Sequence, residues 1–114
     1  MHYKTISALA PLIKSGDLSP VELTQSQLNR IEKLDGTLKA YTTITGEQAL
    51  QEARQAEQEI VKGNYRGPLH GIPIAVKDLC NTSGIRTMGG SYVFRDNIPK
   101  NDATVVKNLR KAGA

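Results

Sequence analysis

The 114-residue chain has no tryptophan and only five aromatic residues, four tyrosines and one phenylalanine, so any core must be mainly aliphatic. Its single cysteine, Cys80, excludes an internal disulfide and a multi-cysteine metal site. No apolar run approaches the roughly 20 residues that a membrane-spanning helix needs. The residues after Met1 also lack the apolar stretch of a signal peptide. We therefore expect a cytoplasmic protein that does not contact a membrane.

Charge of one sign is nowhere concentrated, although the net charge is +4. The longest basic run is Arg110-Lys111, and acidic residues alternate with basic ones through the helical segments. This pattern is typical of a solvated surface, and we expect no nucleic-acid binding through this chain. The ordinary share of hydrophobic and charged residues indicates a globular protein, and the length allows one domain at most.

Helix caps and hydrophobic spacing predict four helices, over about residues 6–15, 20–35, 46–62 and 103–112. The clearest start is Ser19-Pro20, because serine caps a helix and proline suits its first position. Asp35-Gly36 is expected to end the second helix, and Asp102 to cap the last one.

Glycine is concentrated between residues 63 and 91, and this segment contains the apolar run Ile72–Val76. Continuous apolar character is typical of a strand buried on both faces, so a strand is predicted over about 72–77. Helices combined with such a strand indicate the α/β class.

Lys77 and Asp78 follow the predicted strand directly. Ligand crevices in open α/β sheets lie at the carboxyl ends of strands, where a desolvated lysine has a lowered pKa and can act as a base. The alternative is a lysine that leaves the strand for solvent, paired with Asp78. The residues alone leave these two readings equally open.

Three further features have a structural reading that we favour over a functional one. His70 could serve as an acid or base, but a histidine before a glycine more often packs against the turn. Cys80 has no second cysteine or evident base nearby, so a plain thiol is favoured over a nucleophile. Gly89-Gly90-Ser91 could bind an anion or expose a serine, but a simple turn is favoured because no Walker-type lysine accompanies it.

The segment Gly67–Asp78, with the sequence GPLHGIPIAVKD, closely resembles the lysine segment of the amidase signature family. Weaker similarities flank it in the same order along the chain, at residues 19–23, 30–31, 38–41, 84–87 with 90–91, 102–106 and 109–114. The resemblance implies the N-terminal part of the amidase signature fold, a mixed β-sheet core flanked by helices, incomplete in this chain. Residues 1–114 are then an N-terminal fragment of a single amidase domain.

The resemblance also implies a reaction, the hydrolysis of carboxamides by a Ser–Ser–Lys triad without a metal or an organic cofactor. Lys77 matches the triad lysine and is the only catalytic position that carries over. Both serines and the oxyanion loop belong to a family segment that follows the part seen here. The expected partners are a small-molecule amide substrate and a complementing C-terminal part.

Two alternatives remain for the function. The chain could come from the glutaminase subunit of a tRNA-dependent amidotransferase, which belongs to the same family. That subunit usually carries a cysteine shortly after a loop threonine, and Thr87–Ser91 has none, which favours a general amidase. The chain could also be a non-catalytic remnant or an interaction module.

Overall fold

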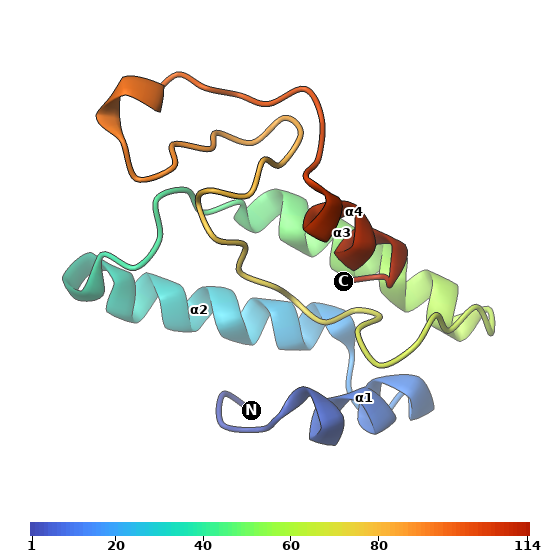
Figure 1. Cartoon of the computed structure of the whole chain (residues 1–114). Helices are drawn as coiled ribbons and strands as arrows, with labels where there is room; N and C mark the ends of the chain where they lie inside the picture. The colour runs from blue at the N-terminus through green and yellow to red at the C-terminus, as the bar shows by residue number, and fades with distance from the viewer. The chain divides into compact units, whose positions relative to one another are not determined.

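A computed structural model describes all residues, Met1–Ala114. Its helices are α1 (Ile6–Ser15), α2 (Pro20–Leu38), α3 (Gly46–Val61), the short 3-10 helix η1 (Tyr92–Phe94) and α4 (Thr104–Lys111) (Figure 1). The chain divides into two compact units. Unit 1 comprises Met1–Pro73 and Ala112–Ala114, and unit 2 comprises Ile74–Lys111. None of the helices is long and apolar enough to cross a membrane.

Local hydrogen bonds mark the end of α1 and the start of α2. Gly16 follows α1 in the left-handed conformation (φ 83°), and its N–H bonds to the Ile13 carbonyl. The Ser19 hydroxyl accepts hydrogen bonds from the Val21 and Glu22 N–H groups, at 3.0 and 3.3 Å. The predicted helix start at Ser19-Pro20 is thereby confirmed, since the serine satisfies amide groups that have no partner inside the helix.

The predicted end of the second helix at Asp35-Gly36 is wrong, because α2 continues to Leu38. The Asp35 carboxylate accepts hydrogen bonds from the Ala40 and Tyr41 N–H groups, at 2.7 and 3.1 Å. It therefore holds the chain just beyond the helix and does not end the helix.

The predicted cap of the last helix is also wrong, because α4 begins at Thr104, two residues after Asp102. The Asp102 carboxylate accepts a hydrogen bond from the Ser83 N–H at 2.7 Å and pairs with Arg110 at 3.0 Å. It joins the start of the helix to a distant loop, which the helix-cap pattern could not indicate.

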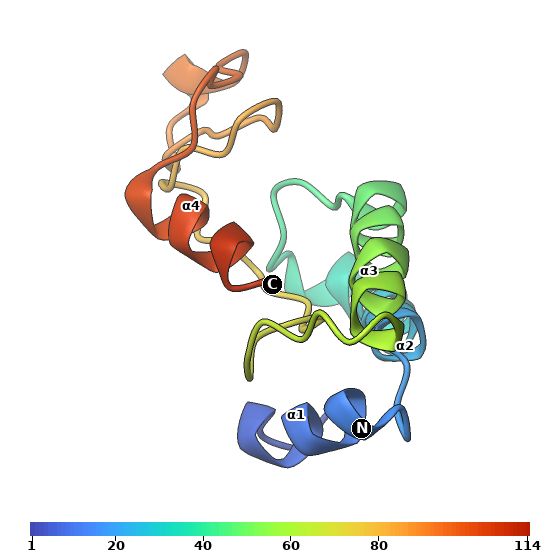
Figure 2. The ribbon, with the colours of Figure 1, turned by 90° about the vertical axis from the view of Figure 1, so that its right-hand side faces the viewer.

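In unit 1, α2 and α3 pack side by side, as the two ribbon views show (Figure 2). The narrow alanine face of α3 is buried at Ala53 and Ala56. Aliphatic side chains from α1, α2 and their surroundings form the core: Leu9, Ile13, Leu18, Leu23 and Ile72. Burying each such side chain stabilises the fold by about 1.5–3 kcal/mol. Ile72 thereby ties the segment after α3 to the two N-terminal helices.

The predicted strand over 72–77 is not formed, and the chain contains no sheet, so the predicted α/β sheet is not found in this structure. The one β-bridge joins Thr82 and Ile85. Ile72 is buried, but Ile74 and Val76 are 38% and 40% exposed. A strand requires hydrogen bonds to a neighbouring strand, and no other segment of the chain supplies one. The apolar run indicated burial correctly only at its first residue.

Unit 2 consists of two extended segments that end in α4. Three backbone hydrogen bonds join them: Gly84 N–H to Pro99 O (3.0 Å), Thr87 N–H to Asn97 O (3.0 Å) and Ala103 N–H to Asn81 O (2.7 Å). Val106 of α4 is buried. These bonds fix the loop that follows Lys77.

Candidate active site

Lys77 is an exposed residue of unit 2 and begins a turn. Its carbonyl accepts a hydrogen bond from the Cys80 N–H at 2.9 Å. The expected burial beside a two-sided strand is absent, because the strand itself is not formed. The structure therefore presents the lysine amine to solvent with its backbone held in a turn.

The Asp78 carboxylate is directed at the loop after the turn. Its Oδ1 atom accepts a hydrogen bond from the Met88 N–H at 2.9 Å, and its carbonyl accepts one from the Gly89 N–H at 2.7 Å. Asp78 therefore joins the lysine turn to the glycine loop.

Gly89 and Gly90 form a turn, as the favoured reading of the sequence had it. Both have positive φ angles, 60° and 72°, and the Ser91 N–H bonds to the Met88 carbonyl at 3.1 Å. Two successive left-handed residues are the pattern of a type I′ turn, which glycine adopts without strain. The Ser91 hydroxyl accepts a hydrogen bond from the Val93 N–H at 3.3 Å and caps η1.

Cys80 is half-buried and unpaired. Its backbone N–H closes the Lys77 turn, and its carbonyl accepts the Thr82 hydroxyl at 3.1 Å. These backbone bonds, rather than the thiol, account for its place in the structure.

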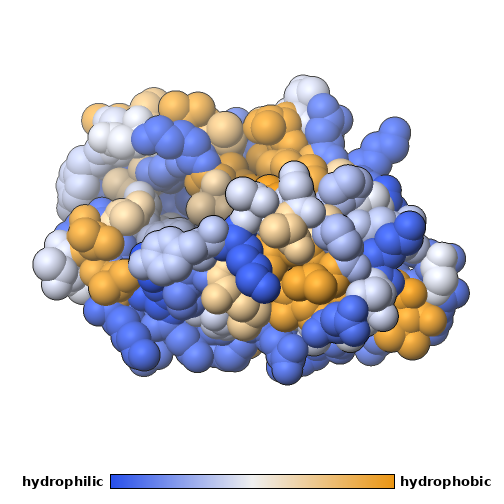
Figure 3. Space-filling view, turned by 90° about the horizontal axis from the view of Figure 1, so that it is seen from below, coloured by the Kyte–Doolittle hydropathy of each residue, from blue (hydrophilic) through white to orange (hydrophobic).

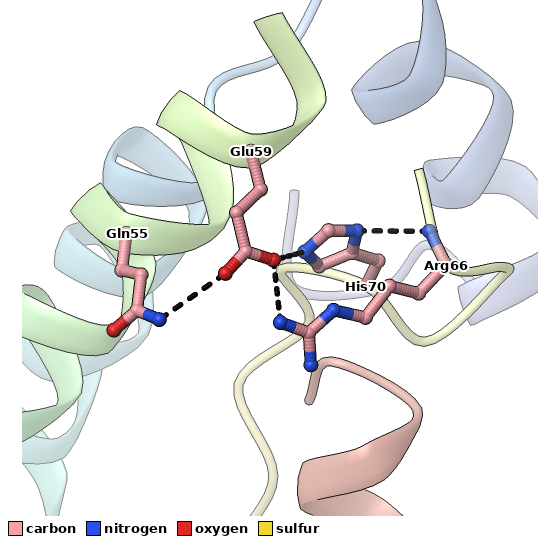
Figure 4. Close-up of polar contacts among 4 residues, drawn as sticks. All are labelled: Gln55, Glu59, Arg66 and His70. Carbon is pink, nitrogen blue, oxygen red and sulfur yellow. Dashed lines mark hydrogen bonds and ion pairs between the residues drawn. The ribbon is translucent and has the colours of Figure 1, made fainter. Parts of the chain in front are cut away.

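His70 belongs to unit 1 and is 1% exposed. Its Nδ1 atom accepts a hydrogen bond from the Arg66 N–H at 3.1 Å, and its Nε2 atom lies 3.2 Å from the Glu59 carboxylate (Figure 4). Burial lowers the pKa of His70 below its ordinary value of 6.5, although the Glu59 carboxylate opposes this change. The histidine therefore packs into the turn, in line with the favoured structural reading.

Glu59 of α3 is a member of this cluster that the sequence did not single out. Its carboxylate also accepts hydrogen bonds from Gln55 at 3.1 Å and Arg66 at 2.7 Å. The hydrogen bond from Gln55 is the main cause of a lowered pKa for Glu59. Gln55 and Glu59 are four residues apart on a helix, and this spacing could have indicated their hydrogen bond.

Comparison with known proteins identifies the class to which this fold and lysine segment belong. The family model described as Amidase matches residues 22–114. A Mycobacterium tuberculosis (strain H37Rv) protein named as an amidase, AmiD, is 49% identical over 96% of this chain and 23% of its own length. A glutamyl-tRNA(Gln) amidotransferase subunit from Methylococcus capsulatus is 46% identical over 100% of this chain and 23% of its own length.

A solved structure agrees with these relatives. The X-ray structure of the peptide amidase from Stenotrophomonas maltophilia is 37% identical, with a TM-score of 0.91 over 98% of this chain and 23% of that one. The chain belongs to the amidase family and has the fold of that enzyme's N-terminal part. The resemblance carried by Gly67–Asp78 is thereby confirmed. The chain spans about a quarter of the length of the relatives it matches.

Proposed function

We propose that this chain supplies Lys77 as the general base of an amidase that hydrolyses a carboxamide to a carboxylate and ammonia or an amine. The observation that carries the proposal is the family match over residues 22–114, which includes the lysine segment Gly67–Asp78. The substrate is a small-molecule amide.

In the proposed mechanism, a nucleophilic serine attacks the amide carbonyl carbon and passes its proton to a second serine. The second serine gives its own proton to the neutral Lys77 amine. That proton is then returned to the leaving nitrogen, which departs as the C–N bond breaks. Water repeats the sequence on the acyl-serine and releases the carboxylate. Neither serine has a counterpart in this chain, so a C-terminal part of the amidase must complement it.

The geometry of unit 2 supports this role for Lys77 in two ways. The Asp78 carboxylate accepts the Met88 N–H, which directs this neighbouring side chain to the glycine loop. The turn to Cys80 and the bond from Gly89 fix the lysine backbone while its side chain stays accessible. A base needs both a defined position and access to the proton that it takes up.

Turnover of Lys77→Ala and Lys77→Arg in an amidase that carries this chain tests the proposal. Removing a general base costs on the order of 10²–10⁴-fold in rate, and we expect that loss from Lys77→Ala. Lys77→Arg should fail equally, because a guanidinium stays protonated. Lys107, an exposed lysine of α4, provides the matched control, and its Ala and Arg variants should keep normal turnover. Near-normal turnover of Lys77→Arg would overturn the mechanism.

The glutaminase component of a tRNA-dependent amidotransferase is the second candidate. The 46% identity to the amidotransferase subunit from Methylococcus capsulatus, over the whole of this chain, supports it. The absence of a cysteine in Thr87–Ser91 favours a general amidase. Comparing the hydrolysis of glutamine with that of other small carboxamides decides between them. Strong preference for glutamine, with a further increase when the other components of the amidotransferase are added, would establish the second candidate.

A further inference from the structure

The carboxylate of Asp78 lies in the same unit as Lys77, one residue after it, and has no part in the proposed chemistry. Its Oδ1 atom accepts a hydrogen bond from the Met88 N–H at 2.9 Å. Its backbone carbonyl accepts a second one from the Gly89 N–H at 2.7 Å. Two successive N–H groups of the glycine loop, residues 88–91, therefore bond to one residue, one through its side chain and one through its main chain.

The glycine loop is itself anchored inside unit 2. Thr87, which precedes it, is buried. The Thr87 N–H donates to the Asn97 carbonyl at 3.0 Å, and the Asn97 side-chain amide donates to the Thr87 carbonyl at 2.9 Å. Within the loop, the Ser91 N–H bonds to the Met88 carbonyl at 3.1 Å. The loop therefore presents donors to Asp78 whose positions are already defined.

Within this chain, Lys77 is tied to distant segments only on its C-terminal side. Residues 74–76, which lead to it, are exposed and make no backbone hydrogen bond. On the other side, the two bonds of Asp78 are the nearest ties to a segment distant in the sequence. The next tie lies four residues beyond the lysine, where the Asn81 carbonyl accepts the Ala103 N–H at 2.7 Å. The place of the lysine backbone in unit 2 therefore depends first on Asp78.

We propose that Asp78 is a positioning residue for Lys77, and that its carboxylate acts as the hydrogen-bond acceptor of the glycine loop rather than as a charge beside the lysine. The inference rests on the proposed function of Lys77. It assigns Asp78 no contact with substrate and no proton transfer.

The expected effect follows from the donor that Asp78 satisfies. Met88 is half-buried, so its N–H loses a bond that is costly to leave unmade when Oδ1 is removed. The glycine loop and the lysine turn can then shift relative to each other. Misplacing a catalytic group by about 1 Å costs on the order of 10²-fold in rate.

Three substitutions of Asp78 separate an acceptor from a charge. Asp78→Asn keeps a carbonyl oxygen at the same distance from the backbone and removes the charge. Asp78→Glu keeps the charge and moves the carboxylate outward by one methylene group. Asp78→Ala removes both the acceptor and the charge. An acceptor role and a charge role therefore predict opposite orders for the Asn and Glu variants.

The test is a double-mutant cycle in a complete amidase that carries this chain. Each Asp78 variant is made in the native and the Lys77→Ala backgrounds, and kcat and KM are measured separately. Asp96, a carboxylate of unit 2 whose side chain is 91% exposed, provides the matched control. Asp96→Asn and Asp96→Ala should keep normal turnover.

We expect Asp78→Ala to lower kcat about 10- to 100-fold and Asp78→Glu about 10-fold, both with little change in KM. Asp78→Asn should keep kcat within about threefold of the native value, because the acceptor is retained. In the Lys77→Ala background all three should change the residual rate by less than about twofold, since a residue that acts through Lys77 has nothing left to position.

Three results would overturn the inference: an unchanged kcat for Asp78→Ala, a loss that persists in the Lys77→Ala background, or a larger loss for Asp78→Asn than for Asp78→Glu. If Asp78→Ala does not fold, the order of the Asn and Glu variants decides. Native turnover of Lys77→Ala alone would instead refute the proposed function.

Discussion

The buried ring of His70 makes the stability of unit 1 depend on pH. Its pKa is lowered below 6.5, first by burial and then by Arg66, against the opposing effect of Glu59. At pH values below about 6.5 the unfolded chain therefore binds a proton that the folded chain resists. Above this range both states are neutral at His70, and the ring adds no pH dependence.

We predict that the thermal midpoint of the protein falls as the pH is lowered from 7.5 through 6.5 to 5. His70→Gln cannot titrate at this position, so its thermal midpoint should fall less over the same range. The difference between the thermal midpoints of the two proteins should therefore narrow as the pH is lowered. Differential scanning calorimetry at several pH values measures both curves. Parallel curves would show that His70 does not titrate differently in the folded and unfolded states.

Cys80 is predicted to be dispensable, because its backbone atoms make the hydrogen bonds that the structure shows. Cys80→Ser and Cys80→Ala both retain these groups. In a complete amidase carrying this chain, either variant should keep most of its turnover, measured with the fold checked by circular dichroism. A loss of several hundredfold with an intact fold would make the thiol catalytic.

At the scale of single residues, the sequence indicated correctly the residues whose partners lie close in the chain. The turn at Gly89-Gly90 and the packing of His70 belong to this group. The hydrogen bond from the Met88 N–H to Asp78 and the contact between Glu59 and His70 were not predicted, because each depends on the path of an irregular loop. Loop paths are set by many weak contacts, and no periodicity encodes them.

At the scale of elements, the four helices lie close to their predicted ranges because a helix satisfies its own backbone and is punctuated by local caps such as Ser19. The strand over 72–77 depends on partners elsewhere, and hydrophobicity alone cannot supply them. The apolar pattern of Ile72–Val76 indicates a buried segment, but within this chain only Ile72 is buried. Local rules thus predicted the helices and left the sheet undetermined.

The packing of Gly71 against α2 can be tested by substitution. A Cβ atom there would lie 2.7 Å from Pro20 Cγ, and the residue has a φ of +78°. Gly63 has a similar φ of +87° but open space around it. We predict that Gly63→Ala loses about 1 kcal/mol from backbone strain alone, and that Gly71→Ala loses about 1–3 kcal/mol more. Chemical denaturation measures both losses in the free energy of unfolding. Equal losses would mean that Pro20 moves away from the added Cβ without a cost in free energy.

At the scale of the whole molecule, the chain leaves large apolar side chains exposed. An amidase four times as long has further residues that can cover them. In unit 2 these exposed side chains are Ile74, Val76, Leu79, Tyr92, Val93, Phe94, Ile98 and Val105. On the face drawn in Figure 3, hydrophobic residues form separate patches among hydrophilic ones. Clustered exposed apolar residues usually mark surfaces that bind other polypeptide.

The 114-residue chain by itself is therefore predicted to associate and to lack amidase activity. Tyr92, Val93 and Phe94 are 75%, 82% and 54% exposed in one continuous run, and burying them between copies removes apolar surface from water. Size-exclusion chromatography with light scattering should show oligomers, and a two-dimensional amide NMR spectrum should show broad peaks.

Two matched substitutions test whether this run causes the association. Val93→Lys interrupts the run and should shift the chain toward monomer. Val61, also 82% exposed but at the end of α3 outside that run, is the control, and Val61→Lys should leave the association unchanged. A sharp, well-dispersed monomer spectrum of the unmodified chain would contradict the prediction, because it would show that these 114 residues fold without the surface that the rest of an amidase provides.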